Sequence, residues 1–195
     1  MLYGLLRFAH FAGLVLIGAG LIGVFLADLR TRQARTLPVF AEAVRNLALC
    51  YDGLVVPGAL LLLGSGAWLI GVFYGWGFMA EPWLAGMVLL FAFEFVEGNT
   101  ITRLYFLRLR RETRAALAAG GFTAELERLR AEQVPTFTHF LDLPLLMVIV
   151  SLGALRPTDW SHFAVGCAAG FVVAGALTFT LPRLYPGELA ALPSR

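Results

Sequence analysis

The chain has 195 residues, of which 59% are hydrophobic and only 14% are charged. Soluble domains carry roughly 25% charged residues, so this composition excludes a water-soluble enzyme. The formal net charge of +2 gives no reason to expect a nucleic acid as a partner. The composition indicates instead a protein whose main partner is the lipid bilayer.

Five apolar stretches are long enough to cross a bilayer as helices, because the hydrocarbon layer takes about 20 apolar residues. They cover residues 4–27, 54–75, 83–106, 137–155 and 161–182. Apolar and polar residues do not alternate with the period of two that a membrane barrel requires. The sequence therefore predicts an all-α membrane protein, a bundle of five transmembrane helices that forms one domain over residues 1–195.

Two further helices are predicted between the spans. Residues 38–51 have the apolar spacing of an amphipathic helix. The third span continues as a charged helix until Gly120 and Gly121 end it. A short helix over 124–133 follows, with two leucines predicted to face the membrane interface, Leu126 and Leu129.

The arginines predict the orientation of the chain in the membrane. All 15 basic residues are arginines, and only Arg7 and Arg156 fall on the side that holds Met1, which leaves 13 on the other side. Basic residues concentrate on the cytoplasmic side of membrane proteins. The N-terminus is therefore expected outside and the C-terminus inside, in a multi-pass protein of a bacterial inner membrane.

Polar residues of the third and fourth spans fall at a similar depth, towards the arginine-rich side. The glutamates of the third span are three residues apart and share a helix face, as do the histidine and aspartate of the fourth. A buried group of this kind could relay protons, hold a quinone head group or bind a metal, or it could satisfy itself without a ligand. The predicted cluster consists of Glu94, Glu97, Asn99, Arg103, His139 and Asp142.

His10 lies in the outer half of the first span, on the same face as Gly13 and Gly20. Small residues beside a membrane histidine leave room for a planar macrocycle, and the iron of haem b would then bind the imidazole. The same pattern also suits a histidine that hydrogen-bonds to a neighbouring helix, with glycines that allow close packing. If haem is present, His10 is the expected axial metal ligand. His162 is the only other histidine at a compatible depth, because His139 lies too far towards the arginine-rich side.

Scattered positions over residues 1–157 resemble the HemJ-type protoporphyrinogen oxidase family and the uncharacterised four-helix membrane families related to it. The matching residues are His10, Phe40, Arg45, Leu47, Pro57, Gly66, Trp68, Glu97, Gly98, Arg103, Phe140, Asp142, Pro144, Arg156 and Pro157. In the oxidases the histidine of the first helix is associated with haem b, so the resemblance implies haem at His10. Three positions depart from the oxidase pattern. Gly86 and Thr138 stand where a lysine and an arginine are expected, and Glu97 matches only as a polar residue, because a histidine is expected there.

Three functions remain open at this point. The first is a haem b protein that transfers electrons, alone or as a subunit of a respiratory chain. The second is a cofactor-free accessory subunit that stabilises a larger membrane complex, and the third is a protoporphyrinogen IX oxidase. Other membrane subunits or a second copy of the chain are expected partners. The fifth span, which the resemblance does not cover, offers a stripe of small residues for docking to such a subunit: Gly166, Gly170 and Ala174.

Overall fold

The computed structural model describes residues 1–185, and all regular structure in that range is helical. Five of its continuous helical stretches are long and apolar enough to cross a membrane, which confirms the predicted fold class. Two of these stretches contain a short π-helical turn. The elements in chain order are α1 (Leu2–Gln33), α2 (Leu37–Cys50), η1 (Tyr51–Val55), α3 (Val56–Phe73), η2 (Gly75–Ala80), α4 (Pro82–Glu97), η3 (Gly98–Thr102), α5 (Arg103–Ala119), α6 (Ala124–Arg130), α7 (Gln133–Leu155) and α8 (Ser161–Leu184).

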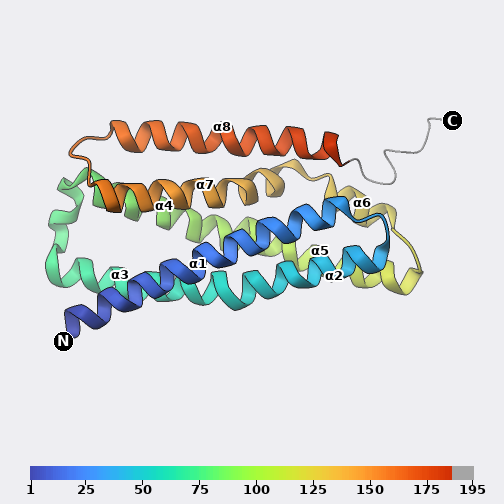
Figure 1. Ribbon diagram of the computed structural model, residues 1–195, viewed down its shortest axis with the longest axis horizontal. Helices are drawn as coiled ribbons and strands as arrows, with labels where there is room; N and C mark the ends of the chain where they lie inside the picture. Colours follow the sequence, from blue (N-terminus) through green and yellow to red (C-terminus); the bar gives the residue numbers. More distant parts are fainter. Residues whose placement is uncertain (186–195) are drawn as a thin grey trace.

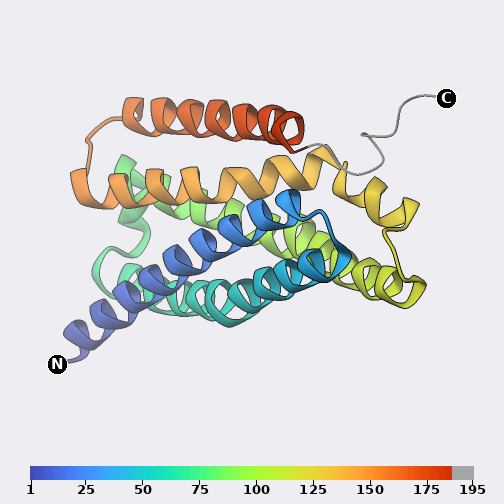
Figure 2. The same cartoon turned by 45° about the vertical axis from the view of Figure 1, so that its right-hand side comes forward.

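The long helices run side by side along the long axis of the molecule (Figures 1 and 2). α3 packs along α1, α4 packs along α7, and α8 lies on the far side of α7. One end of the bundle holds the N-terminus and the α3–α4 and α7–α8 connections, and the other holds the α1–α2 and α5–α6 connections. We call this second end the arginine-rich end, because the loops and helix ends there carry most of the arginines.

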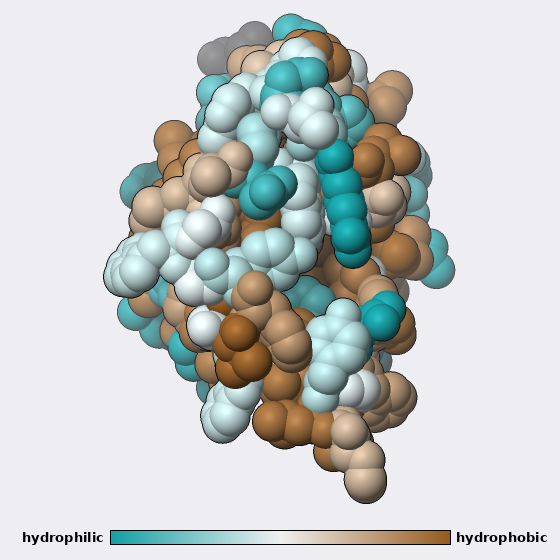
Figure 3. All heavy atoms as spheres, turned by 90° about the vertical axis from the view of Figure 1, so that its left-hand side faces the viewer, coloured by the Kyte–Doolittle hydropathy of each residue, from teal (hydrophilic) through white to brown (hydrophobic). Residues whose placement is uncertain are grey.

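Large apolar side chains cover the outward faces of the bundle. Val15 of α1 is 68% exposed and Val172 of α8 is 71% exposed. Figure 3 looks onto the end opposite the arginine-rich end, where polar side chains mix with hydrophobic ones and hydrophobic side chains extend along the flanks. Such a surface requires a lipid bilayer around the helices, because exposed apolar patches of this size are rare on soluble proteins.

α2 is amphipathic, as predicted, and leads without a break into η1 and α3. Its apolar face, with Phe40 and Leu47 fully buried, packs against α1 and α5. The prediction for the short helix α6 was wrong in one respect. Leu126 and Leu129 do not face the membrane interface but are buried in the same hydrophobic cluster as Phe40, because α6 folds back onto the end of the bundle.

Local signals in the sequence define the ends of several helices. Gly120 ends α5 with a φ of 77°, a left-handed conformation that glycine adopts without strain. The hydroxyl of Thr123 caps α6 by accepting a hydrogen bond of 3.3 Å from the N–H of Leu126. Ahead of α8, the carboxylate of Asp159 accepts hydrogen bonds from the hydroxyl and the N–H of Ser161, which lower the pKa of Asp159.

The small residues of α8 face α7 of the same chain. A Cβ on Gly166 would meet Val148 at 2.9 Å, and one on Gly170 would meet Leu145 at 3.3 Å. Ala174 is fully buried in the same interface. The stripe predicted to dock onto another subunit is therefore already used within the chain, and the expectation of a partner on this stripe was wrong.

Candidate functional site

Two π-helical turns face each other near the arginine-rich end of the membrane-spanning region. The hydroxyl of Tyr51, the first residue of η1, donates a hydrogen bond of 2.7 Å to the carbonyl of Gly98, the first residue of η3. A π turn inserts an extra residue into a helix and is frequent at functional sites. The two turns join the second and third spans at one level of the bundle. No feature of the sequence predicted them.

A cavity of about 220 Å³ lies beside these turns, between α1, α3, α4 and α7. We call it the polar pocket. Most of its wall is apolar, and a smaller set of hydrogen-bonding side chains reaches it from η1, α4, η3, α5 and α7. Those polar lining residues are Tyr51, Glu94, Asn99, Arg103 and Asp142.

The pocket brings together two carboxyl groups. Glu94 of α4 and Asp142 of α7 both line it and lie within interaction range of each other. Asn99 donates one amide hydrogen bond of 2.7 Å to the carbonyl of Phe95, which leaves its second N–H and its oxygen available. Within residues 1–185, Arg103 forms no ion pair with any carboxylate. The pocket can therefore offer both donors and acceptors to a small molecule.

A second layer of polar side chains lies next to the pocket, nearer the arginine-rich end. Glu97 and His139 are 6% and 5% exposed, so both are turned into the bundle. Glu97 Oε1 accepts a hydrogen bond of 2.7 Å from the hydroxyl of Thr102. Glu97 Oε2 and both ring nitrogens of His139 have no hydrogen-bond partner in the described part of the chain. The nearest acid to the imidazole is Asp142, whose Oδ2 is 3.8 Å from His139 Nδ1.

The predicted polar cluster is thus brought together in two layers. Four of its six members, Glu94, Asn99, Arg103 and Asp142, line the pocket. Glu97 and His139 form the second layer. Asn99 and Arg103 are exposed at the pocket's rim, whereas Glu97 and Asp142 are buried in the interior.

His10 contacts a different part of the bundle. Its Nδ1 is 3.1 Å from Ser65 Oγ in α3. Ser65 donates its single hydroxyl proton to the carbonyl of Leu61 at 2.6 Å, so it must accept from His10. Nδ1 therefore carries a proton, and the lone pair of Nε2 is available. His162 shows the same arrangement with Ser151 of α7, at 2.9 Å from Nε2.

The glycines beside His10 are covered by the second span. A Cβ on Gly13 would lie 3.0 Å from the backbone nitrogen of Leu62, and one on Gly20 would lie 2.9 Å from that of Val55. The strip is therefore filled by a neighbouring helix and does not fit a macrocycle. His10 and His162 bond to serines of different helix pairs, α1 with α3 and α8 with α7. Haem binding itself stays a prediction.

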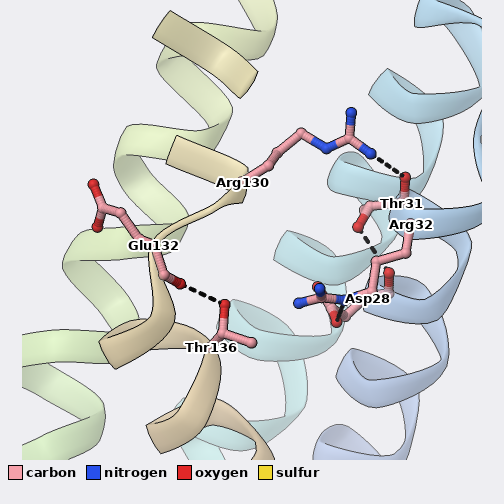
Figure 4. A network of polar contacts seen from close by, with 6 residues as sticks. All are labelled: Asp28, Thr31, Arg32, Arg130, Glu132 and Thr136. Atoms are coloured by element: carbon pink, nitrogen blue, oxygen red, sulfur yellow. Dashed lines mark hydrogen bonds and ion pairs between the residues drawn. The ribbon is translucent and has the colours of Figure 1, made fainter. Parts of the chain in front are cut away.

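Sequence reasoning missed a polar network at the arginine-rich end, which Figure 4 shows. The carboxylate of Asp28 pairs with Arg32 at 2.8 Å, and both side chains are largely buried. Arg130 of α6 pairs with Glu127 at 2.7 Å and donates to the carbonyl of Thr31 at 3.4 Å. Asp28 lies only two residues before Arg30, among the arginines that end the first span, so in sequence it is typical of a solvated helix end.

Comparison with known protein families gives a match over residues 4–157, to a family described as predicted integral membrane proteins, DUF2269. The chain belongs to the DUF2269 family. The match takes in the polar pocket and both π turns and ends before α8, which agrees with the resemblance over residues 1–157 to uncharacterised membrane families. It contains nothing specific to protoporphyrinogen oxidases. No curated protein and no solved structure matches this DUF2269 chain.

Proposed function

We propose that this protein binds the polar head of a small, lipid-soluble molecule, such as a quinone, in the polar pocket. The observation that carries the proposal is the composition of the pocket, an apolar cavity with a few convergent hydrogen-bonding groups at one level. Such cavities are the usual form of small-molecule sites. A volume of about 220 Å³ suits a single ring or head group rather than a whole lipid.

The polar groups suit a ligand that both accepts and donates hydrogen bonds. The guanidinium of Arg103 and the free amide N–H of Asn99 can donate to carbonyl oxygens. The carboxyl pair of Glu94 and Asp142 can accept from hydroxyl groups. The two carboxyl groups lie on facing helices at the same pocket, so a ligand that exchanges protons can reach both of them.

The position of the polar pocket also allows a lipid-soluble ligand to enter it from the bilayer. α3 packs mainly on α1 and α4 mainly on α7, so the pocket lies between two helix pairs. Leu60, which lines it, is 56% exposed on the outer face of α3. A ligand dissolved in the bilayer would enter between α3 and α4.

A steric variant tests the proposal directly. Ala59 lines the pocket from α3, and Ala59→Phe would fill part of the cavity with an aromatic ring. The matched control is Leu63→Phe, one turn further along α3 and 43% exposed to lipid. Binding of a short-chain quinone to the purified protein in lipid nanodiscs should be lost in Ala59→Phe and kept in Leu63→Phe. Equal binding by both variants would reject the pocket as the site.

Haem b at His10 is the second candidate, and with it a role in electron transfer. The supporting observation is the protonation state of His10, because a metal-binding histidine normally donates its second ring N–H to a neighbouring group, as Nδ1 does to Ser65. The close packing of Gly13 and Gly20 against the second span argues against a haem at this position. An absorption spectrum of the purified protein decides between the two. A haem spectrum that His10→Ala abolishes would favour this candidate, and a colourless protein would exclude it.

The setting of either function is also a proposal. The excess of arginines at one end of the bundle supports a cytoplasmic location for that end, in the inner membrane of a bacterium. The polar pocket would then lie in the cytoplasmic half of the membrane.

A further inference from the structure

We propose that His139 and Glu97 form a proton path between the arginine-rich end of the bundle and the carboxyl pair of the polar pocket. The inference rests on the proposed function and deepens it, because it names how the pocket exchanges protons with water. The path involves proton transfer alone. No covalent bond to a ligand is formed or broken, and no electron moves.

The acidic and basic groups are stacked along the bundle. Glu97 follows Glu94 by three residues in α4, and His139 precedes Asp142 by three in α7. Because the two helices are antiparallel, both steps lead towards the arginine-rich end, by about 4.5 Å each at 1.5 Å per residue. The Glu97–His139 layer therefore lies between the pocket and that end.

The imidazole of His139 is suited to relay a proton. Both ring nitrogens lack a hydrogen-bond partner although the side chain is 5% exposed. Buried polar atoms are nearly always paired, so two free nitrogens on one ring require an explanation. Nδ1 is 3.8 Å from Asp142 Oδ2, about 1 Å beyond a hydrogen bond. A small rotation of either side chain would close this gap and pass a proton to Asp142.

The opposite side of the relay is Glu97, whose Oε2 is also buried and without a partner. Its other oxygen is held by Thr102 at 2.7 Å, which fixes the carboxyl group while leaving Oε2 free. The carboxylate oxygens of Glu97 lie beyond ion-pair distance of the ring nitrogens, whose acidic contact is Asp142. A proton on Glu97 would therefore reach His139 through a rotation of the carboxyl group or an intervening water molecule, and the imidazole can then release the proton of its other nitrogen to Asp142. After one proton has passed, Glu97 is again without it and His139 is neutral with its N–H on the other ring nitrogen. The ring must return to its first tautomer before the next proton can follow.

Apolar contacts isolate this relay from competing groups. The imidazole packs against Phe106 and Phe140, with ring centroids 5.5 Å and 5.2 Å away. The titratable groups that act on the imidazole directly are Glu97 of α4 and Asp142 of α7, and the guanidinium of Arg32 of α1 lies over the ring of Phe140.

The path continues towards the surface through α1. The guanidinium of Arg32 lies over the ring of Phe140, 5.2 Å from its centroid, and pairs with Asp28. Next to them, Arg130 donates to the carbonyl of Thr31 from the short helix α6 (Figure 4). Polar groups thus resume beyond the phenyl ring that packs on His139, and the carboxylate of Asp28 is one of them.

Infrared spectroscopy of the full chain in lipid tests the path. A protonated carboxyl group shows a C=O stretching band that shifts when its proton is exchanged for deuterium. In the wild type we expect such a band, assigned to the pocket pair by its loss in Asp142→Asn, to shift at a rate that rapid mixing with D2O resolves. His139→Phe, which keeps an aromatic ring between Phe106 and Phe140, should slow the shift several-fold, and Glu97→Gln should do the same.

The control is His162→Phe, which changes a histidine at the far end of the bundle and should exchange at the wild-type rate. Exchange at the wild-type rate in both His139→Phe and Glu97→Gln would overturn the path, as would the absence of any band that Asp142→Asn removes. Quinone binding, measured on the same samples, separates the two proposals. If both variants exchange slowly and the wild type binds no quinone, the proposed function is rejected and the path is kept. If both variants exchange at the wild-type rate and the wild type binds quinone, the path is rejected and the proposed function is kept.

Discussion

The packing of α1 against the second span predicts that Gly20→Ala destabilises the protein. An added Cβ would lie 2.6 Å from Val55 Cγ2 and 2.9 Å from the backbone nitrogen of Val55. The side chain can turn aside, but the backbone of η1 is held by the bond between Tyr51 and Gly98, so the two helices must separate. Overpacking of this kind typically costs about 1–3 kcal/mol, and removing a helical glycine returns roughly 0.5–1 kcal/mol. The expected net loss in the free energy of unfolding is about 0.5–2 kcal/mol.

Gly18→Ala is the matched control in the same helix. There the nearest atom to an added Cβ is Leu146 Cδ2 at 3.9 Å, an ordinary contact. Only the backbone effect remains, so stability should be unchanged or rise by up to about 1 kcal/mol. The assay is equilibrium unfolding of the detergent-solubilised protein, in which SDS is titrated and helicity is followed by circular dichroism. If Gly20→Ala is as stable as Gly18→Ala, the close approach of α1 to the second span does not require a glycine at position 20.

Two further predictions concern topology and the buried ion pair. Reporter fusions after residues 35 and 120 should both report the cytoplasm, because both points lie among the arginines; a periplasmic signal at either point would refute the orientation. Arg32→Gln should destabilise the protein by about 3–5 kcal/mol, because it leaves the carboxylate of Asp28 buried without its partner. The double variant Asp28→Asn, Arg32→Gln should recover part of that loss in the same SDS titration, and no recovery would contradict a role for the pair.

The spans and the polar cluster could be predicted because each depends on one-dimensional signals. A stretch of about 20 apolar residues has few structures open to it other than a transmembrane helix. Ionisable residues within such a stretch must face the protein interior, so Glu97 and Asp142 were expected to be buried, and both are 6% exposed. Helix length then fixes their depth, which is why residues from two spans meet at one level.

What packs against the glycine strip of the first span could not be predicted from the sequence. Gly13 and Gly20 leave a space that either a cofactor or another helix can fill, and the sequence of α1 is the same in both cases. The outcome is decided by Gly58 and Val55 of the second span, which approach the α1 backbone closely. Such a pairing depends on which helices become neighbours, a property that the hydropathy of either helix alone does not determine.

The two π turns were also not predicted from the sequence, and they affect the shape of the polar pocket. Neither Tyr51–Val55 nor Gly98–Thr102 has a composition that distinguishes it from α-helix, so both were absent from the prediction. A π turn adds a residue without lengthening the helix by a full step, and so it rotates everything that follows relative to what precedes. η3 separates Glu94 and Glu97 from Arg103. The rotation that it introduces, held by the hydroxyl of Tyr51 on Gly98, brings Arg103 to the same pocket as Glu94. Glu97 precedes the turn, and its place in the layer beside His139 follows from its position in α4. The polar pocket therefore depends on the two turns as much as on the polar residues themselves.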